Sequence, residues 1–434
     1  MLYEGTNHEG VPARTLTDEQ VLRRSVMACL LFEDEFYEDG QSISQRLAAL
    51  VSKVAPEKVA EIAIEARTRM HLRHVSLLLV REMARATAAH RALVAATLEA
   101  VIQRADEPAE FLALYWKDGR QPLSAQVKKG LARAIGNFDA YQLAKYNRNH
   151  AVRLRDVLFL THAKPKDEQQ TADFKALAEK TLTAPDTWEV ALSATKGERK
   201  REAWERLLAE RKLGPLALIR NLRNFTECKV SETLVREALA ECFGDRVLPF
   251  RFLAAVRHAP AYAAELEALM FRNLEGQPKL PGHTLLLVDV SPSMNVPLSR
   301  KSEMTRTDAA CGLAVMLREI CESARIFAFS TVCAEAPTYR GLALADAVKR
   351  AAPSDGTLLG SAVGRMNALG YDRLLVVTNE ESQDPVPNPN GRAYMINVAS
   401  AKPGIGYGPW VHLDGWSDAV IAYVREYEAT ASLP

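Results

Sequence analysis

The hydrophobic pattern of the chain changes once, at a short linker near residue 278. From about Thr17 to Leu274, apolar residues recur three and four positions apart, as in VSLLLVREMARATAAH and RALVAATLEAVIQRA, which is the spacing of amphipathic helices. Breaks such as Ala-Pro, Asp-Gly and Glu-Pro separate segments of roughly ten to eighteen residues, a pattern typical of antiparallel helix pairs stacked as an α-solenoid. No strict sequence repeat accompanies them, so the expected repeat is structural only.

Two local signals predict where helices begin. Thr17 is followed three positions later by Gln20, the pairing of a capping box. Pro56 stands ahead of KVAEIAIEARTRM, where a proline belongs in the first helical turn.

Beyond the linker GQPKLPG, strands are expected to alternate with helices. HTLLLVDV, ARIFAFS, RLLVVT and AYMINVA have the pattern of strands, whereas DAACGLAVMLREICES, LALADAVKRA, LGSAVGRMNALG and SDAVIAYVREYEA have that of helices. This alternation predicts a doubly wound, Rossmann-like α/β fold with a mostly parallel sheet. We therefore expect a multidomain protein, with a helical domain over residues 1–278 and an α/β domain over residues 279–434.

Length and composition are those of a soluble globular protein. The 434 residues allow two or three domains of roughly 150 residues each, and 48% of them are hydrophobic and 25% charged. No apolar run reaches the ~18 residues that span a bilayer, and the first residues lack the features of a signal peptide. Six scattered cysteines without a CxxC pair predict small buried side chains in a reducing compartment, so we expect a cytoplasmic protein without a membrane partner.

Positive charge is concentrated in one stretch. The whole chain has a net charge of +1, but residues 117–166, here called the basic segment, hold eleven basic and three acidic residues, a net charge of +8. The basic residues are Lys117, Arg120, Lys128, Lys129, Arg133, Lys145, Arg148, Arg153, Arg155, Lys164 and Lys166. Such a local field predicts a polyanionic partner. The alternative, a solvated helical face, usually mixes both signs of charge.

A loop after the first predicted strand carries the candidate metal ligands. Asp289, Ser291 and Ser293 alternate in DVSPS, and alternate side chains of a tight loop can turn toward one point. A carboxylate and two hydroxyls are hard oxygen donors suited to Mg²⁺ or Mn²⁺. The alternative is an Asp/Ser-rich turn that binds no metal.

This loop resembles the metal-ion-dependent adhesion site (MIDAS) of von Willebrand factor A domains. The resemblance implies two further ligands, Thr357 in PSDGTLLG and Asn379 after RLLVV. The family carries an Asp where this chain has Asn379, so one negative charge is lost and weaker divalent binding is expected. Glu380 and Glu381 stand beside it and offer replacement charge.

The helical part resembles the TROVE module of the Ro autoantigen family. The segments that carry the resemblance are FDAYQLAKYNRNHAVRLRDVLFLTHAKPKD (138–167), GPLALIRNLRN (214–224) and VLPFRFLAAVRHAP (247–260). It implies a monomeric ring of HEAT-like helical repeats closed by the A domain. It also implies that small noncoding RNAs of the Y RNA type bind the outer surface. Single-stranded 3′ ends of defective RNAs are expected in the central hole, with an exonuclease or RNA-repair protein as a partner.

The RNA-binding residues expected from charge and from this resemblance belong to the basic segment. They are Lys128, Lys129, Arg133, Lys145, Arg148, Arg153, Arg155, His162 and Lys164. Core packing is the favoured role of Phe138 and Tyr141, while stacking on bases and core packing stay open for Tyr146. A second group of cations, at Lys196, Arg199, Lys200, Arg201, Arg220 and Arg223, has ion pairing with neighbouring glutamates as its favoured explanation.

We expect an RNA-binding ribonucleoprotein component without catalytic activity. The chain has no Walker A loop, no HExxH and no GxSxG, and one carboxylate among hydroxyls supplies no general base for a nuclease. The alternative is a protein adaptor whose A domain binds a partner's carboxylate through the metal. An adaptor of that kind has no need of the basic segment.

Overall fold

The computed structural model describes residues 5–6, 12–13, 17–27, 40–147, 151–183, 187–188, 192, 198–242, 247, 249–298, 304–399, 410–415 and 419–431. Contacts divide the chain into two compact units. The N-terminal unit comprises residues 17–34 and 40–193, and the C-terminal unit comprises residues 194–434 together with 1–16 and 35–39.

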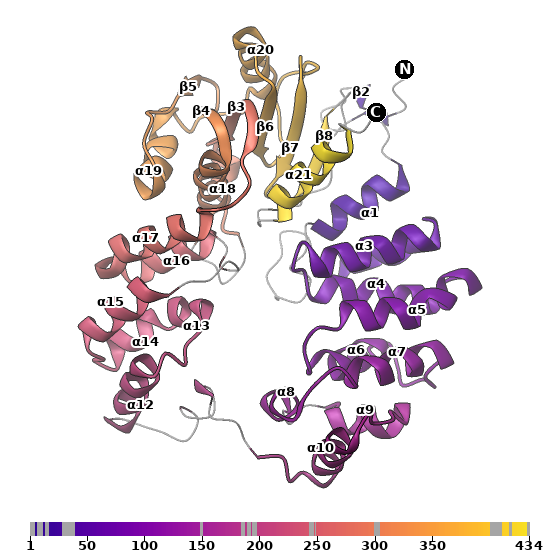
Figure 1. Ribbon diagram of the computed structural model, residues 1–434. Helices are drawn as coiled ribbons and strands as arrows, with labels where there is room; N and C mark the ends of the chain where they lie inside the picture. The colour runs from indigo at the N-terminus through magenta and orange to yellow at the C-terminus, as the bar shows by residue number, and fades with distance from the viewer. Residues whose placement is uncertain are drawn as a thin grey trace. The chain divides into compact units, whose positions relative to one another are not determined.

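The N-terminal unit is a stack of helices in two layers (Figure 1). Its helices are α1 (Asp18–Met27), α2 (Gly40–Val51), α3 (Pro56–Thr68), α4 (His74–Arg85), α5 (Ala88–Val101), α6 (Glu107–Tyr115), α7 (Ala125–Ile135), α8 (Ala140–Tyr146), α9 (Leu154–Thr161) and α10 (Glu168–Glu179). The odd-numbered helices α1 to α9 pack each on the next odd one, and α2, α4 and α6 pack in the same way. Alternate layers of this kind are the helical repeat that the periodicity predicts.

Both predicted helix starts are confirmed. The Thr17 N–H donates to Gln20 Oε1 at 3.0 Å, and the Gln20 N–H donates to Thr17 Oγ1 at 3.2 Å, which is a reciprocal capping box. Pro56 is the first residue of α3.

Helices α5 and α7 pack closely because a glycine lies between them. A Cβ atom on Gly130 would lie 2.8 Å from the Cβ of Leu98 and 3.0 Å from the Cα of Ala95, so a larger residue would force the helices apart. Arg133, one turn further along α7, reaches Glu99 of α5. The two helices therefore run in the same direction, which fixes the outward face of α7.

The C-terminal unit begins with helices and continues into an α/β sandwich. The helices are α12 (Glu198–Ala209), α13 (Pro215–Arg220), α14 (Leu222–Glu227), α15 (Glu232–Glu241), α16 (Pro249–His258) and α17 (Ala263–Leu274). Helices α16 and α17 pack against α18 (Arg306–Ile320), and α17 also packs against α19 (Gly341–Ala351). The contact-based division therefore keeps these helices with the sheet, while the domain boundary expected at residue 278 stays a prediction.

The sheet has six strands in the order β5-β4-β3-β6-β7-β8. They are β3 (Leu280–Asp289), β4 (Cys321–Phe329), β5 (Cys333–Glu335), β6 (Arg373–Thr378), β7 (Arg392–Asn397) and β8 (Val411–Asp414). All neighbours pair in parallel except β4 and β5, and α18, α19, α20 (Leu359–Leu369) and α21 (Ala419–Ala431) supply the helices of the fold. The strand order reverses at β3, the kind of switch point at which α/β folds bind ligands.

The expected helix DAACGLAVMLREICES is wrong at its end. Helix α18 ends at Ile320. Cys321 is already the first residue of β4, where it pairs with Leu280 of β3. Cys311 and Cys321 are buried as expected, whereas Cys228, Cys242 and Cys333 are partly exposed, and Cys29 lies outside the described residues. Among the helices that the structure describes, none has the length and hydrophobicity needed to cross a membrane.

Candidate nucleic-acid interface and candidate metal centre

The cations of α7 point outward because the opposite helix face is buried. Val127, Leu131, Ala134 and Ile135 are all fully buried, which leaves Lys128, Lys129 and Arg133 exposed on the other side. The Arg133 guanidinium donates to Glu99 at 3.1 Å, an exposed pair worth only about 0–1 kcal/mol. Within the part of the chain that the structure describes, Lys128 and Lys129 have no ion-pair partner.

The three acids of the basic segment do not neutralise these lysines. Asp118 pairs with Arg81 and Arg85, both outside the segment. The Asp139 carboxylate caps α8 by accepting the Gln142 N–H at 2.7 Å. The local positive field therefore persists on the exposed side of α7.

The remaining predicted RNA contacts lie on α8, on α9 and directly before and after α9. Lys145, Arg153 and Arg155 are half-buried, whereas His162 and Lys164 are exposed. The third acid, Asp156, accepts the Arg153 N–H at 2.8 Å and lies 3.9 Å from Nε of Arg155. Arg148 lies outside the described residues.

The aromatic side chains of the segment divide into three kinds. Phe138 is 5% exposed, and its expected core role is confirmed. The same expectation for Tyr141 is wrong, because Tyr141 is 55% exposed and Leu143 is the residue of α8 that is buried. The Tyr146 ring is partly buried, with the Arg104 guanidinium 4.7 Å from its centroid and Lys145 Nζ 5.6 Å away.

Arg104 belongs to a buried ionic network that sequence reasoning did not identify. It pairs with Asp106 at 2.9 Å, which also pairs with Arg73 at 2.8 Å. Glu107, fully buried, receives Arg67 at 2.7 Å. Helix periodicity gives no sign of such a network, because its members lie on α3, α6 and the loops between helices.

In the second group of cations, ion pairing is confirmed for two members. Arg201 pairs with Glu205 and Arg223 pairs with Glu227, both at 2.9 Å and four residues apart on one helix. Lys196 lies outside the described residues.

The candidate metal ligands gather at the carboxyl ends of β3 and β6. Asp289 ends β3 and is fully buried; its Oδ1 accepts the Ser291 N–H at 2.9 Å and its Oδ2 accepts the Thr378 hydroxyl at 2.6 Å. Burial raises the pKa of Asp289 to about 6, although these hydrogen bonds act in the opposite direction. Thr378, which sequence reasoning did not assign as a partner, was detectable as the Thr beside Asn379.

The hydroxyls of Ser291 and Ser293 lie 3.2 Å apart. Asn379 Nδ2 donates to Ser293 Oγ at 2.9 Å, while its Oδ1 accepts the Glu381 N–H at 3.4 Å. Asn379 thus presents nitrogen, not oxygen, to the serine hydroxyl. We call residues 289–293, 357 and 378–379 the hydroxyl loop cluster.

Thr357 is held beside these loops by its main chain. Its N–H donates to Gln383 Oε1 at 3.4 Å, and its carbonyl accepts the Gln383 N–H at 2.9 Å. Ser354, in the same loop, accepts a hydrogen bond from Asn295 at 3.1 Å. The loops that carry the predicted ligands are therefore linked to one another.

The donor set fits a hard divalent cation only in part. Asp289, Ser291 and Ser293 supply neighbouring oxygens, but Asn379 in its present orientation does not. The two glutamates that follow Asn379 differ in their surroundings. Glu380 is fully buried, 3.5 Å from His412 Nδ1. Glu381 is exposed, and its charge adds to the rise in the Asp289 pKa. Among the described residues, no group of three or more His, Cys, Asp or Glu is placed to hold a metal.

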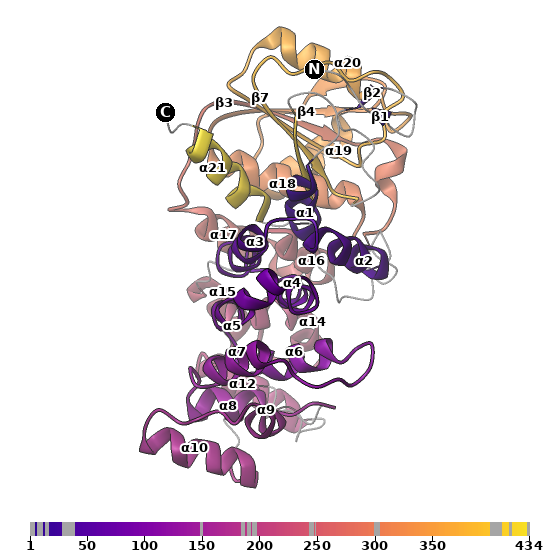
Figure 2. The ribbon, with the colours of Figure 1, turned by 90° about the vertical axis from the view of Figure 1, so that its right-hand side faces the viewer.

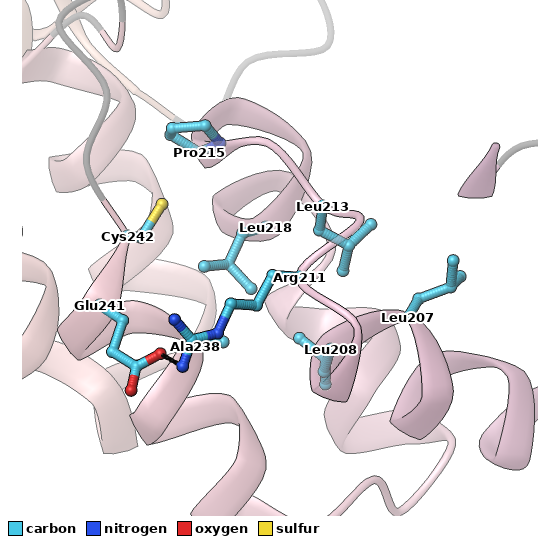
Figure 3. A pocket seen from close by; sticks show the side chains of 9 residues that line it. All are labelled: Leu207, Leu208, Arg211, Leu213, Pro215, Leu218, Ala238, Glu241 and Cys242. Atoms are coloured by element: carbon cyan, nitrogen blue, oxygen red, sulfur yellow. Dashed lines mark ion pairs between the residues drawn. The ribbon is translucent and has the colours of Figure 1, made fainter.

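A separate pocket of about 180 Å³ lies among α12, α13 and α15 (Figure 3). An ion pair between Arg211 and Glu241 lies at its wall. Its other lining residues are Leu207, Leu208, Leu213, Pro215, Leu218, Ala238 and Cys242. None of the predicted site residues lines it.

Comparison with known proteins finds one domain match and one similar structure. The TROVE domain matches residues 176–271, a stretch that includes the segments 214–224 and 247–260 but no residue of 138–167. The crystal structure of the Deinococcus radiodurans Ro (RSR) protein has a similar fold, with a TM-score of 0.65 and 17% sequence identity over 94% of this chain and 98% of that one. No curated protein matches the sequence. The chain therefore carries a TROVE-domain match over residues 176–271 and has a fold similar to that of a bacterial Ro protein.

Proposed function

We propose that the protein binds RNA through the basic segment and acts, without catalysis, in RNA quality control, stability or repair. The observation that carries this proposal is the presence of exposed lysines, Lys128, Lys129 and Lys164, that have no ion-pair partner among the described residues. Phosphates are the natural counterpart of such lysines. The TROVE match and the Ro-like fold support the same function.

The RNA partners follow from the family resemblance. Small structured, Y-like noncoding RNAs would bind the exposed cations of α7 and the exposed Lys164 that follows α9, and defective RNAs would enter a central hole by their single-stranded 3′ ends. An exonuclease or RNA-repair protein would act beside this chain, which would work as a monomer in the cytoplasm.

The hydroxyl loop cluster would hold Mg²⁺ or Mn²⁺ in the manner of a von Willebrand A domain. Asp289, Ser291, Ser293 and Thr357 would be the ligands, and Asn379 would join them only after its amide turns its oxygen inward. The cation would supply a Lewis-acidic contact for an anionic group of a partner. One carboxylate among hydroxyls favours binding over hydrolysis, because no general base accompanies it.

Crosslinking of RNA to the protein in its native host tests the main proposal. We expect RNA to be recovered well above an uncrosslinked control, with crosslinked peptides from residues 117–166. A variant with Lys128 and Lys129 changed to Ala should recover less RNA. The matched control changes Lys53 and Lys58, two exposed lysines of the same unit, to Ala. No recovery with the wild type, or equal recovery with both double variants, would contradict the proposal.

A further inference from the structure

Two of the most exposed large hydrophobic side chains of the protein lie in the basic segment. Phe159 is 59% exposed and Tyr141 is 55% exposed. Burial of an aromatic side chain of this size normally stabilises a fold by about 1.5–3 kcal/mol, so leaving two of them in water forgoes a gain. Both rings lie among the cations of the basic segment, so a partner that contacts these cations can also contact the rings.

On α9, Phe159 belongs to an outward row of three side chains. The buried face of the helix carries Leu154, Val157, Leu158 and Thr161. Arg155 and Phe159 are four residues apart and lie on the other side of the helix, and His162 follows directly after the last helical residue. His162 ends the helix in a left-handed conformation, with φ of 52°, and is exposed. The row therefore presents a cation, an aromatic ring and an imidazole in succession.

On α8, Tyr141 is paired with a cation in the same way. Lys145 follows it by one helical turn, and its Nζ lies 6.0 Å from the centre of the Tyr141 ring. Tyr146 differs from Tyr141, because Arg104 already covers its ring at 4.7 Å. Tyr141 and Phe159 thus keep exposed rings, whereas Tyr146 is occupied.

The two helices are linked through a third one. Helix α10 packs against both α8 and α9, and the three helices group together at one end of the N-terminal stack in both views (Figures 1 and 2). Two aromatic rings with a cation one turn away on the same helix are therefore carried by neighbouring helices.

We propose that Tyr141 and Phe159 stack on unpaired bases of RNA, so that the exposed sides of α8 and α9 take loops or single-stranded segments. The inference rests on the proposed RNA binding and names the RNA class for this surface. A duplex exposes phosphates but hides the faces of its bases, and it needs cations without exposed rings. Unpaired nucleotides offer both a charged backbone and flat faces, which are what cations beside aromatic rings complement.

The test compares two labelled probes, an oligoadenosine and a blunt RNA duplex with the same number of phosphates. Stacking contributes roughly 1–3 kcal/mol per base, so Phe159→Ala and Tyr141→Ala should each weaken oligoadenosine binding about tenfold. Duplex binding should stay within a factor of about two, since its phosphate contacts persist. Phe159→Tyr and Tyr141→Phe keep a ring and should restore binding, whereas Phe159→Leu keeps only apolar area and should not.

Two further measurements separate stacking from other causes. A 2-aminopurine placed in the oligonucleotide should be quenched by the wild type, less by Phe159→Ala, and not by the variant that combines Phe159→Ala with Tyr141→Ala. Tyr339→Ala, which removes a ring 53% exposed in the C-terminal unit, should change neither probe's affinity. If the alanine variants lose affinity for both probes equally, the rings have a structural role. If both affinities are unchanged, the rings serve another partner, such as a protein. Either result overturns the inference while RNA binding stands. A wild type that binds neither probe would overturn the proposed function as well.

Discussion

The basic segment and the hydroxyl loop cluster hold their charges in opposite ways. Lys128 and Lys129 are exposed, and no described residue pairs with them, whereas Asp289 is fully buried and both its oxygens accept hydrogen bonds. An exposed charge costs the fold little and stays available to a partner, while a buried charge must be satisfied within the protein. The first region is thus prepared for a ligand, and the second is already satisfied without one.

The largest effect is expected from removing the buried charge. Asp289→Ala leaves the Thr378 hydroxyl and the Ser291 N–H without their acceptor, at a cost of about 1–3 kcal/mol for each group. Urea unfolding should show a lower midpoint with an unchanged slope. Asp355→Ala is the control, because this exposed carboxylate also accepts hydroxyls and its loss should cost far less. Equal stability of the two variants would contradict the comparison.

Burial, rather than the unit in which a group lies, decides how strongly an ionisable side chain affects stability. His74 of the N-terminal unit tests this. Burial, followed by the charge of Arg73, lowers the pKa of His74 to about 4 from 6.5. The unfolded chain then binds more protons between these pH values, so stability falls as the pH drops from about 6.5 to about 4. The loss is at most about 3 kcal/mol. His74→Gln should flatten this part of the pH profile, which urea unfolding at several pH values measures.

On the exposed side, the expected change is in salt dependence rather than stability. Each phosphate contact of a single strand contributes about −0.7 to the log–log salt slope, so Lys128→Ala with Lys129→Ala should reduce the slope by roughly one to two. Thermal unfolding should be unaffected, because both side chains lie in solvent. Titrations of fluorescent hairpin RNA at several salt concentrations measure the slope, with the Lys53 and Lys58 double variant as control. A slope equal to that of the wild type would reduce the segment to a solvated face.

A smaller effect, on metal affinity, is expected when a carboxylate replaces the Asn379 amide in the hydroxyl loop cluster. Asn379→Asp replaces the amide that donates to Ser293 by a carboxylate, which adds an oxygen ligand and a negative charge. Calorimetric titration with Mg²⁺ or Mn²⁺ should show binding about tenfold tighter than for the wild type, a gain of about 1.4 kcal/mol. Asn295→Asp adds the same charge at the end of the DVSPS loop, outside the predicted ligand set. If the wild type binds equally well, the neighbouring Glu381 already supplies the charge.

The sequence predicted periodic features well and side-chain orientation poorly. Short apolar runs located β3, β4, β6 and β7, and Thr17 and Pro56 marked two helix starts, because these signals are local. The exposure of Tyr141 could not be foreseen, since a seven-residue helix offers too few positions to define its buried face. The direction of the Asn379 amide was equally hidden, because it depends on Ser293, which lies 86 positions away in the sequence.

The last prediction concerns the 3′ end of the RNA and tests the ring expected from the family resemblance. If a central hole accepts a single strand but not a wider duplex, a hairpin with a single-stranded 3′ tail should bind several-fold more tightly than the same hairpin made blunt. The preference should survive scrambling of the tail, because backbone charge and stacking carry little sequence information. A hairpin with the same tail at its 5′ end separates threading from stacking on Tyr141 and Phe159: stacking accepts a tail at either end, whereas threading requires the 3′ end. Equal affinity for the two tailed hairpins would remove the threading mode and leave the exposed surface of the N-terminal unit as the site of RNA binding.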